Sequence, residues 1–198
     1  MAAAALWTQA RNPDAVNLFV ASDHHIPDDE AFRETVRVAS EAASKGRIVT
    51  FGIVPSAPSS AYGYIAPRGA GLSEIQAFVE KPDLATAERH IADGYLWNSG
   101  NFVVRADVLS DELRETTPGL IEAVSDALNA STIDGPAVLL GRRFVDAPKI
   151  SIDYAVMEKT LRASVLPVTY EWSDLGAWDA VHTVSYTHLR AHETRGNL

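Results

Sequence analysis

The sequence predicts an α/β protein built on an open, mostly parallel sheet. Short apolar runs alternate with longer segments of helical periodicity, which is the pattern of strands joined by helices. The clearest case covers residues 17–54, where an apolar run, an amphipathic segment and a second apolar run follow one another. Connections of this kind are right-handed and join parallel strands. Polar residues directly follow several of the runs, as expected where a sheet binds a small ligand at its strand ends.

The first predicted unit runs from a strand at 17–21 to a strand at 47–54. The first strand is short and apolar, and it delivers Asp23 at its carboxyl end. Asp28 is the predicted N-cap of the following helix, since aspartate accepts hydrogen bonds from the first free backbone amides. Gly46 is the predicted stop of that helix.

Two further strands are predicted over 62–65 and 75–80. Gly63 interrupts the first of them, which marks a bulge or a place where a ligand or backbone comes close. Glu80 ends the second strand. Because a residue before proline is pushed into extended geometry, we expect Lys81 to be extended at the strand end.

The middle of the chain predicts a helix over 83–93, a turn at 98–100 and a strand at 102–105. Asp83 is the expected N-cap of that helix. Asn98 would then lie in the turn, where its amide can be both donor and acceptor.

The last elements are two helices and a strand. Thr117 and Pro118 predict a helix start, with threonine at the cap and proline at the first helical position. Ser151 is expected to cap a second helix that carries Asp153 in its first turn, where the helix dipole favours a carboxylate. A final strand is predicted over 164–168.

Composition limits the class of protein. The chain has 198 residues, 46% of them hydrophobic, which suits a single domain. Its net charge of −9 argues against duplex DNA or RNA as a partner. It has no cysteine, which excludes disulfides, thiolate zinc sites and cysteine nucleophiles. No apolar run reaches the length of about 20 residues needed to cross a membrane. The absence of cysteine fits a reducing cytoplasm, which is the expected location, and a homo-oligomer is compatible with the sequence.

The two ends of the sequence differ from the rest. The opening lacks the basic region of a signal peptide and has the character of a helix interior. The stretch after Val184 has no apolar face that could join a core. We therefore expect residues 1–184 to form a domain that is incomplete at its N-terminus, and residues 185–198 to be a non-native tail.

Four motifs carry a family resemblance. They are FVEKP at 78–82, WNSGNF at 97–102, SIDYAVMEKT at 151–160 and WSDLGAW at 172–178. Their order and wording resemble the sugar-phosphate nucleotidyltransferases, in particular those that use mannose 1-phosphate and GTP. The resemblance covers about 12–184. It implies a Rossmann-like, three-layer α/β/α fold, Mg²⁺ as cofactor, and formation of GDP-mannose and pyrophosphate.

The resemblance also implies roles for individual residues. Asp23 and Asp174 would bind one metal ion, and Lys81 would face the sugar phosphate as a catalytic and binding residue. The remaining residues implied in substrate binding are Gly63, Glu80, Asn98, Ser151 and Asp153. Without the resemblance each has an ordinary interpretation: a loop or capping aspartate, an exposed charge pair at 80–81, a bulge, a turn and a helix cap.

Three functional alternatives remain open. The leading one is guanylyl transfer to mannose 1-phosphate, and the second is a glucose-1-phosphate thymidylyl- or uridylyltransferase. The third is a non-catalytic sugar-phosphate-binding module, because the glycine-rich phosphate loop and the basic residue that such enzymes carry near their beginning do not occur in this sequence. We therefore expect this chain alone to be weakly active or inactive.

Overall fold

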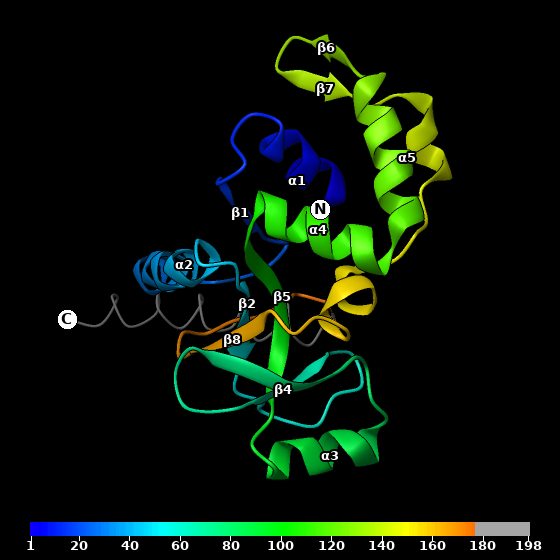
Figure 1. The fold of residues 1–198 in the computed structure, drawn as a ribbon. Coiled ribbons are helices and arrows are strands. Elements are labelled where there is room, and N and C mark those ends of the chain that lie inside the picture. The colour runs from blue at the N-terminus through cyan, green and yellow to red at the C-terminus, as the bar shows by residue number, and fades with distance from the viewer. Residues whose placement is uncertain (177–198) are drawn as a thin grey trace, which may run out of the picture.

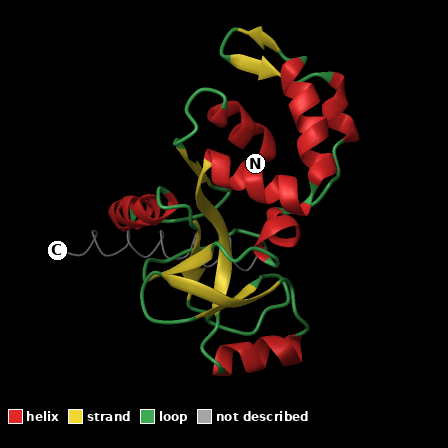
Figure 2. Ribbon diagram, in the orientation of Figure 1, coloured by secondary structure: helices red, strands yellow, loops and turns green. Residues whose placement is uncertain are grey.

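The fold was obtained as a computed structural model that describes residues 1–176. It is a mixed α/β structure around a six-stranded sheet, with a separate two-stranded hairpin (Figures 1 and 2). The strands are β1 (Val16–Phe19), β2 (Ile48–Ile53), β3 (Tyr64–Pro67), β4 (Ser73–Val79), β5 (Leu96–Arg105), β6 (Thr132–Asp134), β7 (Ala137–Leu139) and β8 (Ala163–Val168). The helices are α1 (Ala2–Gln9), α2 (Asp29–Ala43), α3 (Leu84–Ala92), α4 (Ala106–Thr116), α5 (Pro118–Asn129), the 3₁₀-helix η1 (Arg142–Asp146) and the π-helix η2 (Asp153–Met157).

The central strands are buried on both faces, which makes the domain three-layered. Successive residues of a strand point to opposite faces. Accordingly Ile48 belongs to one hydrophobic core with α1, α4, α5 and η2, whereas Val49 belongs to another with α2. Strand β5 alternates in the same way, with Phe102 and Val104 in the first core and Val103 in the second. The predicted α/β/α layering is confirmed.

The sheet is mixed: β1, β2, β3 and β8 run in one direction, as the predicted mostly parallel sheet requires, and β4 and β5 run in the other. The strand order is β1-β5-β2-β8-β4-β3, and β2–β8 is the one parallel pairing among the described strands. Strand β5 lies between β1 and β2 and runs antiparallel to both, so β1 and β2 are parallel to each other without being hydrogen-bonded. Strand β5 is ten residues long and buried over most of its length.

The predicted turn at 98–100 is part of β5. Gly100 has φ of +74°, and the β2–β5 register shifts between Thr50 and Gly52. The glycine therefore makes an irregularity within the strand instead of ending it.

The sequence did not predict helix α4 or the hairpin β6–β7. Helix α4 begins directly after β5, and its N-cap residue Arg105 makes no side-chain capping bond, so no sequence signal marks its start. The hairpin β6–β7 is short and exposed, and Figure 1 shows it at the opposite end of the molecule from α3. Within residues 1–176, no helix has both the length and the apolar character needed to cross a bilayer.

Candidate functional site

Asn98 is the centre of a polar cluster that joins three elements. Its backbone N–H donates to the carbonyl of Gly63 at 2.8 Å. In its side chain, Oδ1 accepts from the Thr50 hydroxyl at 2.8 Å and from the Gly100 N–H at 3.2 Å. Nδ2 donates to Oδ1 of Asp153 at 3.0 Å. Strand β5 thus brings together Gly63 and Asp153, which are 90 residues apart in the sequence.

These contacts narrow the predicted role of Asn98. Its Oδ1 already accepts two hydrogen bonds, which uses both lone pairs of an amide oxygen. One Nδ2 hydrogen is directed to Asp153, which leaves the other for a ligand. The amide is thus both donor and acceptor within the protein, and toward a ligand it has one Nδ2 hydrogen left to donate.

Glu80 lies beside Gly63, immediately after β4. Its side chain is only 9% exposed. A Cβ built on Gly63 would lie 2.5 Å from Oε2 of Glu80, and also 3.3 Å from Cζ of Phe78. Residue 63 is therefore glycine because the Glu80 carboxylate occupies the space of a side chain. The sequence had suggested a bulge or close approach by a ligand or backbone, but the group that comes close is a carboxylate.

Lys81 adopts a conformation that the sequence did not predict. It has φ of +48°, in the left-handed region, although a residue before proline was expected to be extended. Its Nζ lies 3.7 Å from Oε1 of Glu80, and its side chain is 60% exposed. The other non-glycine residue with positive φ in the described chain is Leu175, directly after Asp174. Such strained backbone is costly and concentrates at functional sites.

Two carboxylates of the cluster are electrostatically perturbed. Burial raises the pKa of Glu80, and the nearby charges of Asp153 and Glu158 add to that increase, while Lys81 opposes it. Burial likewise raises the pKa of Asp153, against hydrogen bonds from its own backbone, Ser151 and Asn98. Two carboxylates held close together with little water favour a ligand that donates hydrogen bonds to them.

Ser151 lies next to this cluster, just before the π-helix η2. Its carbonyl accepts from the Ala155 N–H at 2.9 Å, and its hydroxyl lies 3.5 Å from the Tyr154 N–H. The same hydroxyl hydrogen-bonds to Asp153 and lowers its pKa. The segment forms a π-helix whose N-cap is Ile152, with no side-chain capping bond there, so the predicted cap at Ser151 is one residue off and Ser151 makes only a long contact with the first turn.

Asp23 and Asp174 lie on two segments that the fold brings side by side. His25 and Ser173 form an isolated antiparallel bridge, with N–H to O distances of 2.8 and 3.1 Å. Asp23 is two residues before this bridge and Asp174 is one residue after it. The segments that carry the two predicted metal ligands are thus adjacent, although 150 residues separate them in sequence.

An aromatic group connects this pair of segments to the polar cluster. Tyr62 donates its hydroxyl hydrogen to Oδ1 of Asp174 at 3.0 Å. Its ring lies 4.7 Å from that of Trp97 and 5.6 Å from that of Trp172, between centroids. Trp172 in turn donates its indole N–H to Nδ1 of His24 at 3.3 Å. Because Tyr62 precedes Gly63, the Asp174 region and the Glu80 region are neighbours. Trp178 of the same motif lies outside the described residues.

The donor set of this region suits magnesium better than zinc. Among residues 1–176, no group of three or more His, Asp or Glu side chains is arranged to hold a metal ion. Structural zinc requires about four protein ligands, whereas Mg²⁺ commonly takes one or two carboxylates and completes its shell with water and substrate phosphate oxygens. A pair of aspartates on adjacent segments fits the second pattern.

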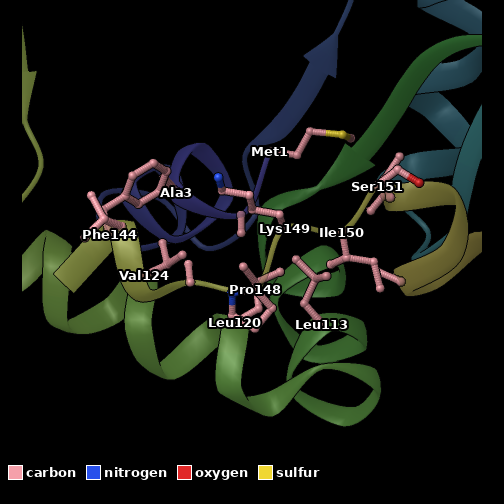
Figure 3. Close-up of a pocket in the computed structure, with 15 residues that line it drawn as sticks. Met1, Ala3, Leu113, Leu120, Val124, Phe144, Pro148, Lys149, Ile150 and Ser151 are labelled. Carbon is pink, nitrogen blue, oxygen red and sulfur yellow. The ribbon is translucent and has the colours of Figure 1, made fainter.

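A separate pocket lies against the first core. It has a volume of about 620 Å³ and is lined by Met1, by residues of α1, α4, α5 and the segment 144–152, and by Ala155 of η2. Figure 3 shows Ser151 at one side of it and Phe144 at the other. Its lining is apolar, including Leu113, Leu120 and Phe144, and Lys149 is its one charged side chain among the described residues. It offers no carboxylate for a metal or a sugar.

Two residues of the site were missed in the sequence. Thr50 carries a hydroxyl in the otherwise apolar, fully buried strand IVTFGI, and that polar residue was an available signal. Tyr62 had no comparable signal, because an aromatic residue before a strand is common in cores.

Comparison with known proteins identifies the family. The sequence profile described as "Nucleotidyl transferase" matches residues 1–191. The chain belongs to this nucleotidyl transferase family. It is 44% identical over 201 residues to the xanthan biosynthesis protein XanB of Xanthomonas campestris pv. campestris (strain B100), covering all of this chain and 43% of that protein. It is 40% identical over 210 residues to the mannose-1-phosphate guanylyltransferase of Escherichia coli (strain K12), again covering all of this chain and 43% of the relative.

The fold has solved counterparts. A crystal structure named mannose-6-phosphate isomerase from Helicobacter pylori superposes with a TM-score of 0.80 at 29% identity, over 87% of this chain and 68% of that chain. The chain spans less than half the length of the two curated relatives named above.

Proposed function

We propose that the protein takes part in guanylyl transfer from GTP to mannose 1-phosphate, which yields GDP-mannose and pyrophosphate. Membership of the nucleotidyl transferase family supports the reaction class. The choice of sugar and base is supported by the 40% identity to a relative named mannose-1-phosphate guanylyltransferase. The observation that carries the proposal is the cluster of Glu80, Asn98 and Asp153 around Gly63, because it offers a hexose a matched set of acceptors and one donor.

In this proposal the hexose binds at the polar cluster. Glu80 and Asp153 accept hydrogen bonds from sugar hydroxyls, and the remaining Nδ2 hydrogen of Asn98 donates to a sugar oxygen. Gly63 leaves room for the Glu80 carboxylate beside the sugar. Lys81, exposed at the edge of the cluster, faces the 1-phosphate and offsets its charge. Ser151 orients Asp153 and stays outside direct contact with the sugar.

The transfer needs no nucleophile from the protein. An oxygen of the sugar 1-phosphate attacks the α-phosphorus of GTP, the bond to the β-phosphate oxygen breaks, and pyrophosphate leaves with that electron pair. Holding two bound reactants in line can supply about 7–11 kcal/mol of barrier reduction. Asp23 and Asp174 would hold Mg²⁺, which when bound neutralises phosphate charge. Since GTP is the expected donor, we also propose that the protein acts in the cytoplasm.

Calorimetric titration of the 198-residue chain with mannose 1-phosphate, glucose 1-phosphate and GTP–Mg²⁺ tests the proposal. We expect mannose 1-phosphate to bind more tightly than glucose 1-phosphate. Preference for glucose 1-phosphate would contradict the choice of sugar and favour the thymidylyl- or uridylyltransferase alternative. Binding of mannose 1-phosphate without any binding of GTP would support a sugar-phosphate-binding module.

A further inference from the structure

Strand β2 contains one polar side chain in a setting where an apolar one would be expected. All six of its residues, Ile48–Ile53, are buried, and Thr50 is 0% exposed. A buried hydroxyl is costly unless it is hydrogen-bonded, and valine would fill the same volume without that cost. Thr50 therefore needs an explanation beyond packing.

The contacts of Thr50 lead directly to the sugar cluster. Its Oγ1 lies 2.8 Å from Oδ1 of Asn98 and 3.0 Å from the carbonyl oxygen of Asn101. Both partners are acceptors, so Thr50 is the donor and its single hydroxyl hydrogen is shared between the two oxygens. With no exposed surface, Thr50 itself cannot touch a ligand.

The orientation of the Asn98 amide is fixed by its neighbours. The Gly100 N–H can only donate, so the amide oxygen must face it. The Asp153 carboxylate accepts, so the amide nitrogen must face Asp153. Thr50 adds the shortest of these three hydrogen bonds, and it approaches from the buried interior of the sheet.

We propose that Thr50 is a positioning residue that holds the Asn98 amide with its nitrogen toward Asp153 and the ligand. This inference rests on the proposed function for its sugar substrate, but the amide orientation can be tested without any ligand. With the amide held in this orientation, the free Nδ2 hydrogen of Asn98 can donate to a sugar oxygen. If the amide were rotated, its oxygen would face both Asp153 and the sugar. It would then repel the Asp153 carboxylate and could not donate a hydrogen bond to a sugar oxygen.

Two substitutions separate the hydroxyl from the shape of the side chain. Thr50→Val keeps the volume and removes the donor, whereas Thr50→Ser keeps the donor and removes a methyl group. We expect Thr50→Val to weaken mannose 1-phosphate binding by about 2- to 12-fold, the value of one net hydrogen bond. Thr50→Ser should bind within about twofold of the wild type, and neither variant should alter GTP affinity. Equal sugar affinity of Thr50→Val and wild type would overturn the inference.

A ligand-free measurement keeps this result distinct from a failure of the proposed function. Carboxyl ¹³C NMR titration follows Asp153 directly. Loss of the Asn98 hydrogen bond should raise the pKa of Asp153 in Thr50→Val but not in Thr50→Ser, whether or not mannose 1-phosphate binds. The same pKa in all three proteins would refute the positioning role. If Thr50→Val does not fold, NMR of the wild type tests the inference. We expect the Thr50 hydroxyl proton to exchange slowly with water and to show a nuclear Overhauser effect to the Asn98 side-chain amide. A rapidly exchanging hydroxyl proton would count against the inference.

Discussion

Gly63→Ala is the substitution that most directly perturbs the polar cluster. The new Cβ would lie 2.5 Å from Oε2 of Glu80, 3.3 Å from Cζ of Phe78 and 3.4 Å from Cβ of Asn98. Real Cβ atoms do not approach other atoms as closely as 2.5 Å, so the Glu80 carboxylate must move away. Its position at the end of a flexible side chain allows that movement, whereas the contacts with Phe78 and Asn98 remain tight.

The expected size of the effect differs between stability and binding. Overpacking costs about 1–3 kcal/mol, and the value should be near the lower limit because the main clash is with a movable group. A hydrogen bond to a charged group contributes about 1.5–3 kcal/mol, so displacing Glu80 should weaken mannose 1-phosphate binding by about 10- to 150-fold. Urea unfolding and calorimetric titration measure the two quantities separately.

Gly119→Ala is the matched control. Gly119 lies in α5, and a Cβ built there meets no atom within 4 Å. The control should keep wild-type sugar affinity and gain up to about 1 kcal/mol of stability from its better helix propensity. If Gly63→Ala binds mannose 1-phosphate as tightly as this control does, Glu80 is not part of the sugar site and the reasoning is refuted.

Substitutions at the four charged residues Asp23, Asp174, Glu80 and Lys81 test other parts of the site. Asp23→Asn and Asp174→Asn should each abolish the Mg²⁺-dependent part of GTP binding, and a normal Mg²⁺ dependence in either would reject the shared ion. Glu80→Gln should increase the free energy of unfolding at pH 7 but not at pH 3. Burial and the charge of Asp153 raise the pKa of Glu80 in the folded protein, Glu158 adds to the increase, and Lys81 opposes it. The native state therefore loses stability as the pH rises from the unfolded-state pKa of Glu80 through its folded-state pKa. Exposed Glu88→Gln is its control, and an equal gain at both pH values would contradict the electrostatic cause. Lys81→Gly should weaken sugar-phosphate binding and stabilise the protein by about 1 kcal/mol, because glycine relieves the left-handed backbone strain. Lys81→Ala should weaken binding to the same degree without the gain in stability. Equal stability of the two variants would contradict the strain.

Local features of the fold could be predicted from the sequence because they depend on neighbouring residues. Asp28 and Asp83 were predicted as helix caps, and they accept hydrogen bonds from the N–H groups of Ala31 and Thr86 at 2.9 and 2.7 Å. At the start of α5, Thr117 occupies the predicted cap position, but its hydroxyl makes no capping bond. The location of a cap is thus a stronger prediction than its hydrogen bond.

The order of strands could not be predicted from local patterns. An apolar run shows that a strand is buried, but it does not show which strands are its neighbours. Strand β5 therefore came between β1 and β2 without any signal in their own sequences. The conformation of Lys81 was missed for a related reason, since the preference of a residue before proline is weaker than the constraints of the tertiary fold.

The candidate site was likewise predictable in part: its residues could be named from the sequence, but their hydrogen-bond pattern could not. The motifs indicated which residues would gather, and the structure brings Gly63, Glu80, Asn98 and Asp153 together as the family resemblance implied. The hydrogen-bond polarity within the cluster is set by Gly100 and Asp153 and supported by Thr50, a buried residue of another strand. Such support from a distant strand is fixed by packing and leaves only a weak trace in the sequence.

The most direct test of the account is NMR mapping of mannose 1-phosphate on the ¹⁵N-labelled chain. We expect the largest shifts at the backbone amides of Gly63 and Lys81 and at the side-chain amide of Asn98. Shifts concentrated at Val124 and Phe144, which line the apolar pocket, or no shifts at saturating mannose 1-phosphate, would contradict the central claim that the cluster around Asn98 is the hexose site.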